Sequence, residues 1–150
     1  MSRIALYFLI GLLILYAVVS GLLALFQEKL IFMPEVLPQD YTYEFSSDFE
    51  ELFLESHDGM ALLNALHFKV KNPKGVVVYY HGNAGQLADW GHVVQDFVAS
   101  DYDVLVMDYR GYGKSTGKLS EKALYSDALL FYEYASERYP EDKITVYGRS

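Results

Sequence analysis

Cysteine is missing from the sequence, so disulfides, thiolate nucleophiles and cysteine-based zinc sites are all excluded. Positive charge is also scarce, because 12 lysines and arginines stand against 20 acidic residues for a formal net charge of −8. A surface of that sign repels phosphates, which argues against nucleic acid as a partner. The four histidines are scattered and lack the spacing of a metal site.

Charge is absent altogether from residues 4–26, IALYFLIGLLILYAVVSGLLALF. At about 1.5 Å of rise per residue, a helix of this length spans roughly 34 Å, enough to cross a hydrocarbon core of about 30 Å. We therefore expect a retained transmembrane anchor and a single-pass membrane protein. The alternative is a cleaved signal peptide, although such apolar regions run only about 7–15 residues and residues 18–20 make a poor cleavage site. The basic residues Arg3 and Lys29 leave the side of the membrane open, with a slight preference for the N-terminus inside and the domain outside.

Around this anchor the chain divides into four parts. They are an N-terminal tip at 1–3, the anchor at 4–26, a juxtamembrane connector at 27–48 and a domain at 49–150. Residues 41–45 in the connector are a candidate for a short edge strand.

The domain alternates strand-like and helix-like segments. Residues 50–56 and 60–70 flank Asp58-Gly59, a pair typical of a β-hairpin. Apolar residues at helical spacing predict one helix after residue 87 and another that begins near Ser120. Three β-branched or aromatic runs, typical of strands buried in a parallel sheet, complete the pattern at 75–80, 103–109 and 143–147. The order predicts an α/β fold: an N-terminal hairpin, then parallel β-α-β-α-β with right-handed crossovers.

A glycine-bearing segment follows each parallel strand. These segments are HGNAG at 81–85, RGYGKSTGK at 110–118 and the YGRS that ends at Ser150. Because ligands bind at the carboxyl ends of parallel strands, we expect the three segments to converge at one edge of the sheet. Two phosphate-binding motifs do not match this sequence. In a Walker A motif ending at Gly113-Lys114-Ser115, the first glycine would fall at Asp108. In a dinucleotide-binding motif starting at Gly111, the last glycine lies one residue too late, at Gly117.

Ser150 has the sequence context of a nucleophile elbow, in which a serine projects from a sharp turn directly after a strand. Gly148 stands two residues earlier, where a side chain is expected to collide with the neighbouring turn. The pair predicts a serine nucleophile for acyl transfer.

The HGNAG turn is the expected partner of this serine. Acyl transfer develops negative charge on the carbonyl oxygen, which backbone N–H groups can stabilise. We expect the N–H of Asn83 to be one donor, with Ala84 as the alternative. His81 is expected to hydrogen-bond the backbone and shape the turn rather than act as a base, and Gly82 and Gly85 support the turn.

Three further polar residues lie near this edge. Asp108 closes the second parallel strand and could either tune the site or cap the loop at Arg110, and we expect it to cap the loop. Lys114 and Ser115 are expected to be solvated loop residues.

Four motifs together carry a family resemblance. FQEKLIF, HGNAG, DYRGYGKSTG and YGRS resemble the α/β-hydrolase superfamily, and more narrowly its membrane-anchored ABHD-like serine hydrolases, which overlap with serine aminopeptidase and lysophospholipase-like domains. The resemblance covers residues 26–150. It implies Ser150 as nucleophile, Asn83 in the oxyanion hole, a catalytic Asp and His later in the chain, and no metal or organic cofactor. It also implies a small-molecule or lipid-like acyl ester as substrate.

The order of the triad in this superfamily is serine, then acid, then histidine. We therefore expect the N-terminal half of an α/β-hydrolase domain, truncated at the nucleophile elbow: a serine hydrolase when complete, and inactive as 150 residues. The alternative is a non-catalytic α/β-hydrolase-like membrane scaffold or binding protein. Esterase, thioesterase and peptidase chemistry all remain open.

Overall fold

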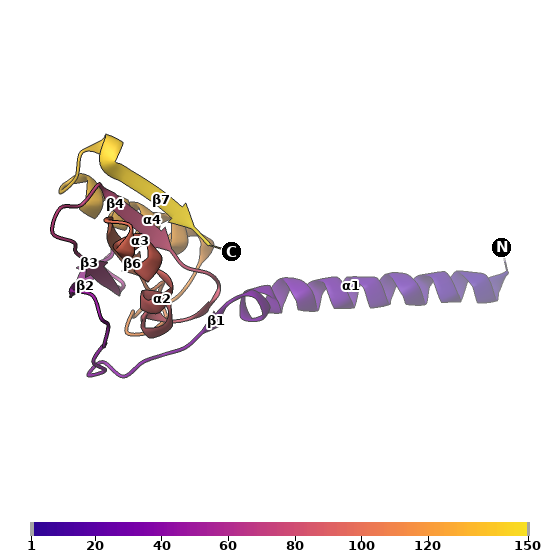
Figure 1. Cartoon of the computed structure of the whole chain (residues 1–150). Helices are drawn as coiled ribbons and strands as arrows, with labels where there is room; N and C mark the ends of the chain where they lie inside the picture. The colour runs from indigo at the N-terminus through magenta and orange to yellow at the C-terminus, as the bar shows by residue number, and fades with distance from the viewer. Residues whose placement is uncertain (1, 150) are drawn as a thin grey trace. The chain divides into compact units, whose positions relative to one another are not determined.

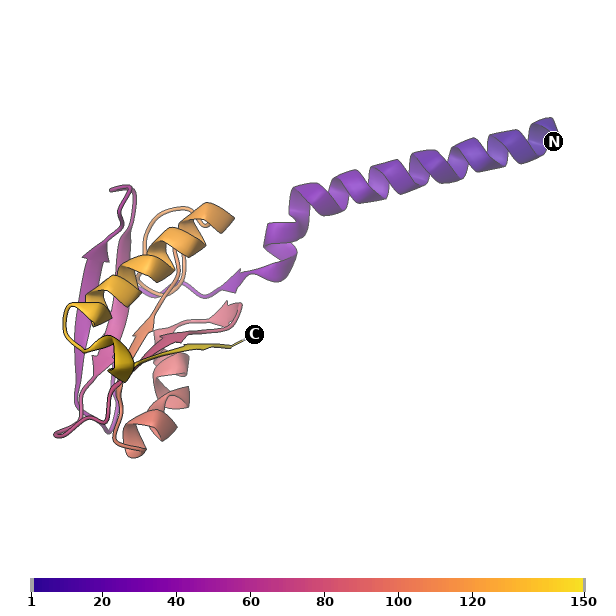
Figure 2. The ribbon, with the colours of Figure 1, turned by 90° about the horizontal axis from the view of Figure 1, so that it is seen from above.

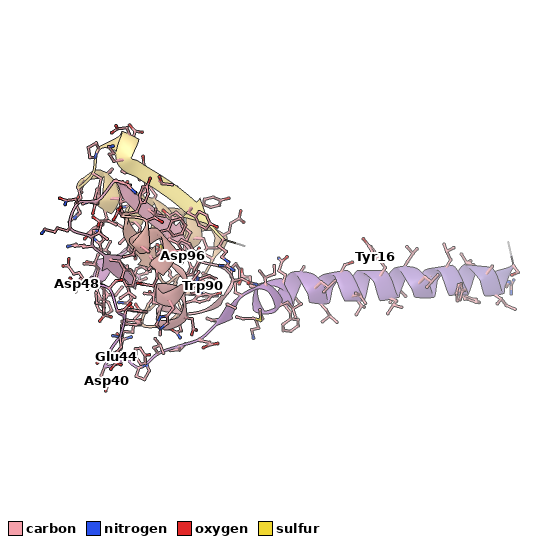
Figure 3. All side chains as sticks on the ribbon, in the orientation of Figure 1. Tyr16, Asp40, Glu44, Asp48, Trp90 and Asp96 are labelled. Carbon is pink, nitrogen blue, oxygen red and sulfur yellow. The ribbon has the colours of Figure 1, made fainter. Side chains whose placement is uncertain are left out.

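The structure, a computed structural model, describes residues 2–149 and contains two compact units, Met1–Met33 and Pro34–Ser150. The first unit is the helix α1 (Arg3–Ile31), whose first turn is capped where Ala5 N–H donates to the Ser2 hydroxyl at 3.2 Å. Its side chains project on every side and none is buried, as Tyr16 illustrates in Figure 3. With a mean hydropathy of 2.6, α1 is long and apolar enough to cross a membrane.

The second unit is built on a five-stranded sheet in the order β2-β3-β6-β4-β7 (Figure 1). The strands β2 (Phe49–Glu55) and β3 (Leu62–Phe68) form the predicted antiparallel hairpin. At its turn, the Asp58 carboxylate accepts hydrogen bonds from Ser56 Oγ and Met60 N, and Gly59 has a φ of 66°. This conformation explains why Asp-Gly occupies the turn.

The strands β4 (Val76–Tyr80), β6 (Asp103–Met107) and β7 (Ile144–Gly148) are parallel, with β4 between the other two. The predicted α/β class, with a hairpin followed by parallel β-α-β-α-β, is therefore confirmed. Because the chain moves from β4 to β6 on one side and then to β7 on the other, the strand order reverses at β4. Ligand crevices form at such reversals in α/β sheets.

Helices cover both faces of the sheet (Figure 2). On one face α2 (Leu87–Val93) and α3 (Gln95–Ala99) pack over Val77 and Tyr79, and on the other α4 (Glu121–Ser136) packs over Val76 and Val78. Alternate residues of β4 thus point into two separate cores, as expected for a doubly covered strand. A 3₁₀ turn (Glu141–Lys143) leads into β7.

Two local predictions were wrong. The helix after residue 87 is interrupted at Val94, which separates α2 from α3. Residues 41–45 form no strand, because Tyr43 and Phe45 pack inward instead of pairing with an edge. Tyr43 Oη donates to Asn64 Oδ1 at 2.8 Å, and the Phe45 ring occupies the space that a side chain at Gly91 would need.

The remaining strands are two-residue pieces, β1 (Met33–Pro34) and β5 (Ala84–Gly85). Within the second unit the connector runs beside the loops, since Glu35 N–H donates to Gly85 O at 3.4 Å and Glu35 O accepts from Gly113 N–H at 2.7 Å. The connector therefore helps to hold the turn after β4 against the loop after β6.

Candidate active site

The three glycine-bearing segments begin at one edge of the sheet. Tyr80, the last residue of β4, is in register with Met107 of β6 and with Gly148 of β7. The HGNAG turn, the loop from Asp108 and the segment from Arg149 therefore leave three neighbouring strands at the same level, so the expected convergence is confirmed.

The backbone of the HGNAG turn is held by side chains at four consecutive carbonyls. The oxygens of His81, Gly82, Asn83 and Ala84 accept hydrogen bonds, in that order, from Tyr109 Oη (2.9 Å), His81 Nδ1 (2.7 Å), Tyr112 Oη (2.8 Å) and Trp90 Nε1 (2.9 Å). In a planar trans peptide the N–H points away from the C=O, so fixing the carbonyl also fixes the amide that follows it. The amides of residues 82–85 are consequently preorganised.

This arrangement includes both amides that the sequence predicts as oxyanion donors. The Asn83 N–H belongs to the peptide whose carbonyl His81 holds, and the Ala84 N–H belongs to the peptide held by Tyr112. Asn83 is exposed and Ala84 is half-buried, so the middle of the turn is open to solvent. Their role in catalysis stays a prediction.

His81 is buried within the turn and stacks on Trp90 of α2, with ring centroids 5.5 Å apart and planes at 17°. Figure 3 labels Trp90 on this helix. The carbonyl oxygen of Gly82 can only accept a hydrogen bond, so the Nδ1 of His81 carries a proton.

The segment that leads to the predicted nucleophile lies beside the same tryptophan. Arg149 N–H donates to Tyr80 O at 2.9 Å, and the Arg149 guanidinium lies 5.5 Å from the centre of the Trp90 ring. A Cβ at Gly82 would be in van der Waals contact with the Trp90 ring at 3.4 Å and with Arg149 O at 3.8 Å, so the turn, the tryptophan and the Arg149 backbone lie close together. Ser150 itself lies outside the described residues, and its position stays a prediction.

The steric reason predicted for Gly148 is absent from the described part of the chain. A Cβ added there would meet no atom within 4 Å among residues 2–149.

Asp108 was predicted to cap the Arg110 loop, and this prediction was wrong. Its Oδ2 accepts the N–H of Leu87, the first residue of α2, at 3.3 Å, and its Oδ1 lies 3.2 Å from His81 Nε2. Both side chains of this pair are fully buried. Burial raises the pKa of Asp108, and the neighbouring His81 opposes that rise.

Lys114 and Ser115 are buried, so the prediction that they are solvated was wrong. Lys114 Nζ forms an ion pair with Glu51 of β2 at 2.8 Å. Ser115 Oγ donates to Asp108 O and accepts from Asn64 N–H, both at 2.8 Å. The loop after β6 folds back onto the hairpin, a contact between segments far apart in the sequence.

Arg110 is a structural residue that the sequence did not reveal. Its Nε and one terminal nitrogen donate to the two oxygens of Asp127 on α4 at 2.7 and 2.8 Å. The terminal nitrogens also donate to Asp58 at 3.0 and 3.1 Å. These hydrogen bonds lower the pKa of Asp58, and they tie the loop to the hairpin turn and to α4.

No group of three or more histidine or acidic side chains within residues 2–149 could hold a metal ion. The polar features of this edge are therefore oriented amides, tyrosine hydroxyls and one buried His–Asp pair. Oriented amides are the kind of group that stabilises a developing oxyanion.

The sheet order and the loops at this edge are those of the α/β-hydrolase fold. A Pyrococcus furiosus esterase superposes with a TM-score of 0.62 at 21% identity, over 79% of this chain and 47% of the esterase. At that identity the likeness shows the fold alone.

The family follows from the sequence comparisons. Residues 71–150 match the family described as serine aminopeptidase, S33. Protein bem46 of Schizosaccharomyces pombe is 31% identical, over 87% of this chain and 47% of that protein. The lysophosphatidylserine lipase ABHD12 of Danio rerio is 40% identical, over 50% of this chain and 20% of that protein. The chain belongs to the serine aminopeptidase S33 family of α/β-hydrolases, and it spans about half the length of the first curated relatives that it matches, or less.

Proposed function

We propose that the complete protein is a membrane-anchored serine hydrolase that cleaves acyl esters with Ser150 as its nucleophile. The observation that carries this proposal is the HGNAG turn, in which four side chains orient consecutive peptides beside the strand that leads to Ser150. A preorganised donor of this kind serves a reaction that develops charge on a carbonyl oxygen.

In the proposed cycle the Ser150 hydroxyl oxygen attacks the carbonyl carbon of the ester. The hydroxyl proton passes to the general base of the triad, a histidine that the superfamily places after the serine. The Asn83 N–H stabilises the oxyanion of the tetrahedral intermediate. The bond to the alcohol oxygen then breaks, the alcohol takes the proton and leaves, and the acyl group stays on Ser150 as an ester.

Water completes the cycle. It attacks the acyl-enzyme while giving a proton to the same base, and the second tetrahedral intermediate collapses to release the carboxylic acid and restore the Ser150 hydroxyl. The same oxyanion donor, the N–H of Asn83 or alternatively that of Ala84, serves both intermediates.

Two observations favour a lipid-like ester. The apolar helix α1 supports a single-pass membrane location, where lipid substrates are concentrated. One relative is named a lysophosphatidylserine lipase, and this chain shares 40% identity with it over 78 residues. The basic residues near the two ends of α1, Arg3 and Lys29, slightly favour a domain outside and an N-terminus inside.

The test is ester hydrolysis by the full-length protein in membranes or detergent, with p-nitrophenyl acyl esters and a lysophospholipid as substrates. The wild type is expected to release one equivalent of alcohol in a rapid burst and then to turn over steadily. The matched control Ser150→Ala should abolish both phases. Turnover that survives in the alanine variant would overturn Ser150 as nucleophile, and absence of turnover with every ester would favour the scaffold alternative.

A further inference from the structure

Asp108 is a fully buried carboxyl at the candidate site, and the acyl-transfer cycle does not use it. It directly follows β6, whereas the predicted oxyanion donor follows β4. Its contacts run to both the imidazole of the turn and the first amide of α2. Burying a carboxyl group costs free energy unless the group has hydrogen-bonding or charged partners. The buried position of Asp108 therefore suggests a specific function for its side chain.

We propose that Asp108 is a positioning residue for the oxyanion hole, acting through His81: it keeps the imidazole proton on Nδ1, where that proton holds the peptide that carries the Asn83 N–H. The inference rests on the proposed function, because it assigns a second residue to the same oxyanion hole.

The first step concerns the tautomer of His81. The Gly82 oxygen lies 2.7 Å from Nδ1 and can only accept, so the proton must be on Nδ1. Nε2 then faces Asp108 Oδ1, which lies 3.2 Å away. Neither atom has another hydrogen-bond partner among the described residues, so each depends on the other.

Burial raises the pKa of Asp108, which favours its protonated carboxyl. A protonated Asp108 at 3.2 Å donates to Nε2, so the imidazole keeps its own proton on Nδ1, facing the Gly82 oxygen. The opposite tautomer would leave Nδ1 as an acceptor against the Gly82 carbonyl oxygen, which repels it.

The second step connects His81 to the donor. The Gly82 carbonyl and the Asn83 N–H belong to one planar peptide, so a hydrogen bond to the carbonyl fixes the direction of the N–H. A hydrogen bond accepted at the carbonyl also polarises the peptide and strengthens its N–H as a donor. Asp108 thereby influences an atom that it does not touch.

The third step concerns how Asp108 is itself held. Leu87 N–H fixes Oδ2, and the Ser115 hydroxyl fixes the backbone carbonyl of the same residue at 2.8 Å. Gly113, with a φ of 49°, leaves room for the carboxylate, because a Cβ there would overlap Asp108 Oδ2. The loop after β6 thus encloses the carboxyl in one orientation.

The experiment compares Asp108→Asn with Asp108→Leu in the full-length protein. Asparagine can still accept from Leu87 N–H and donate to Nε2, so the proton stays on Nδ1, whereas leucine does neither. We expect Asp108→Leu to lower kcat about 10- to 100-fold, less than the roughly 10²–10³-fold loss of an entire oxyanion donor, with little change in KM. Asp108→Asn should recover most of that loss. Equal losses in both variants, or a rise in KM at constant kcat, would overturn the proposal.

Asp103→Leu is the matched control. Asp103 is also a buried aspartate, but it begins β6, at the end of the strand opposite to Asp108, and it accepts from Val70 N–H at 2.7 Å. The Asp103→Leu variant should have a lower midpoint of thermal unfolding without the selective loss in kcat expected for Asp108→Leu. A similar kcat loss in both leucine variants would show a merely structural effect.

A second measurement covers the case in which Asp108→Leu does not fold. The ¹⁵N chemical shifts of the His81 ring in the wild type report which nitrogen carries the proton. A protonated Nδ1 supports the proposal, and an unprotonated Nδ1 overturns it. Labelling of Ser150 by a fluorophosphonate separates the two claims: no adduct in the wild type contradicts the proposed function, whereas an adduct together with unchanged kcat in the Asp108 variants contradicts this inference alone.

Discussion

The phenol of Tyr112 donates a hydrogen bond to the backbone carbonyl of Asn83 at 2.8 Å, so a residue after β6 orients the turn after β4. Tyr112 is fully buried, and Asn83 is exposed. The buried phenol of Tyr112 thus orients a peptide at the accessible surface of the turn, which is the arrangement that a preorganised amide requires.

Replacing Tyr112 by phenylalanine should therefore reduce catalysis more than stability. We expect a loss of about 0.5–1.5 kcal/mol in the free energy of unfolding, typical of one hydrogen bond, and a several-fold fall in kcat. Tyr80→Phe is the control, because Tyr80 Oη also donates to a backbone carbonyl, that of Ala128 on α4, at 2.6 Å. It should lose similar stability and keep kcat. Enzyme assays and thermal unfolding of both variants test the difference, and equal kcat values in the two would contradict it.

Arg110 should be important for stability. Arg110→Ala leaves Asp127 buried without its partner, which costs about 3–5 kcal/mol for a buried pair. Arg110→Lys keeps the charge but loses the two-pronged geometry, so an intermediate loss is expected. Arg138→Ala is the matched control, since Arg138 pairs with exposed Glu137 and should change stability by less than about 1 kcal/mol. Unfolding can be followed by the fluorescence of Trp90, the single tryptophan. Similar losses in the two alanine variants would contradict the role of the buried pair.

The stability of the domain should fall in acid partly because of His67. Burial lowers the pKa of His67 to about 4, below its ordinary value of 6.5, so the folded state binds this proton less readily than the unfolded chain does. The contribution of His67 to the free energy of unfolding is fully present above the pKa of the unfolded chain, about 6.5. It is lost as pH falls from about 6.5 to about 4, where the free energy of unfolding decreases by up to about 1.4 kcal/mol per pH unit.

The measurement is the unfolding free energy of wild type and His67→Gln at several pH values between 7 and 4.5. The glutamine variant, which does not titrate there, should show a shallower decline. Parallel declines would contradict the assignment to His67.

Much of this fold could be predicted from the sequence because the patterns that specify it lie within short segments of the chain. The β-branched runs predicted β4, β6 and β7, and Asp58-Gly59 predicted the hairpin turn. Their register then brought the three glycine-bearing segments to one edge, as expected from parallel topology.

The errors came from contacts between distant segments. Lys114 meets Glu51 across 63 positions, and Asp108 meets Leu87 across 21, so no local pattern could reveal that these side chains are buried. Tyr43 and Phe45 have strand-like propensity, but burial of their rings in the core outweighs pairing at an edge.

The apolar helix α1 should remain in the mature protein as its anchor. The intact mass of protein extracted from membranes should include residues 2–31, and removal of residues 1–26 should release the protein into the soluble fraction. A mature N-terminus shortly after Ser20 would instead support a cleaved signal peptide. Persistent membrane binding without residues 1–26 would contradict the anchor.

The most direct test of the central claim is peptide mapping of the full-length protein after labelling with a fluorophosphonate. The probe reacts with a serine that is activated and supported by an oxyanion hole. We predict one adduct on Ser150, absent from Ser150→Ala and slowed in Tyr112→Phe. No adduct, or an adduct on another serine that persists in Ser150→Ala, would contradict the account.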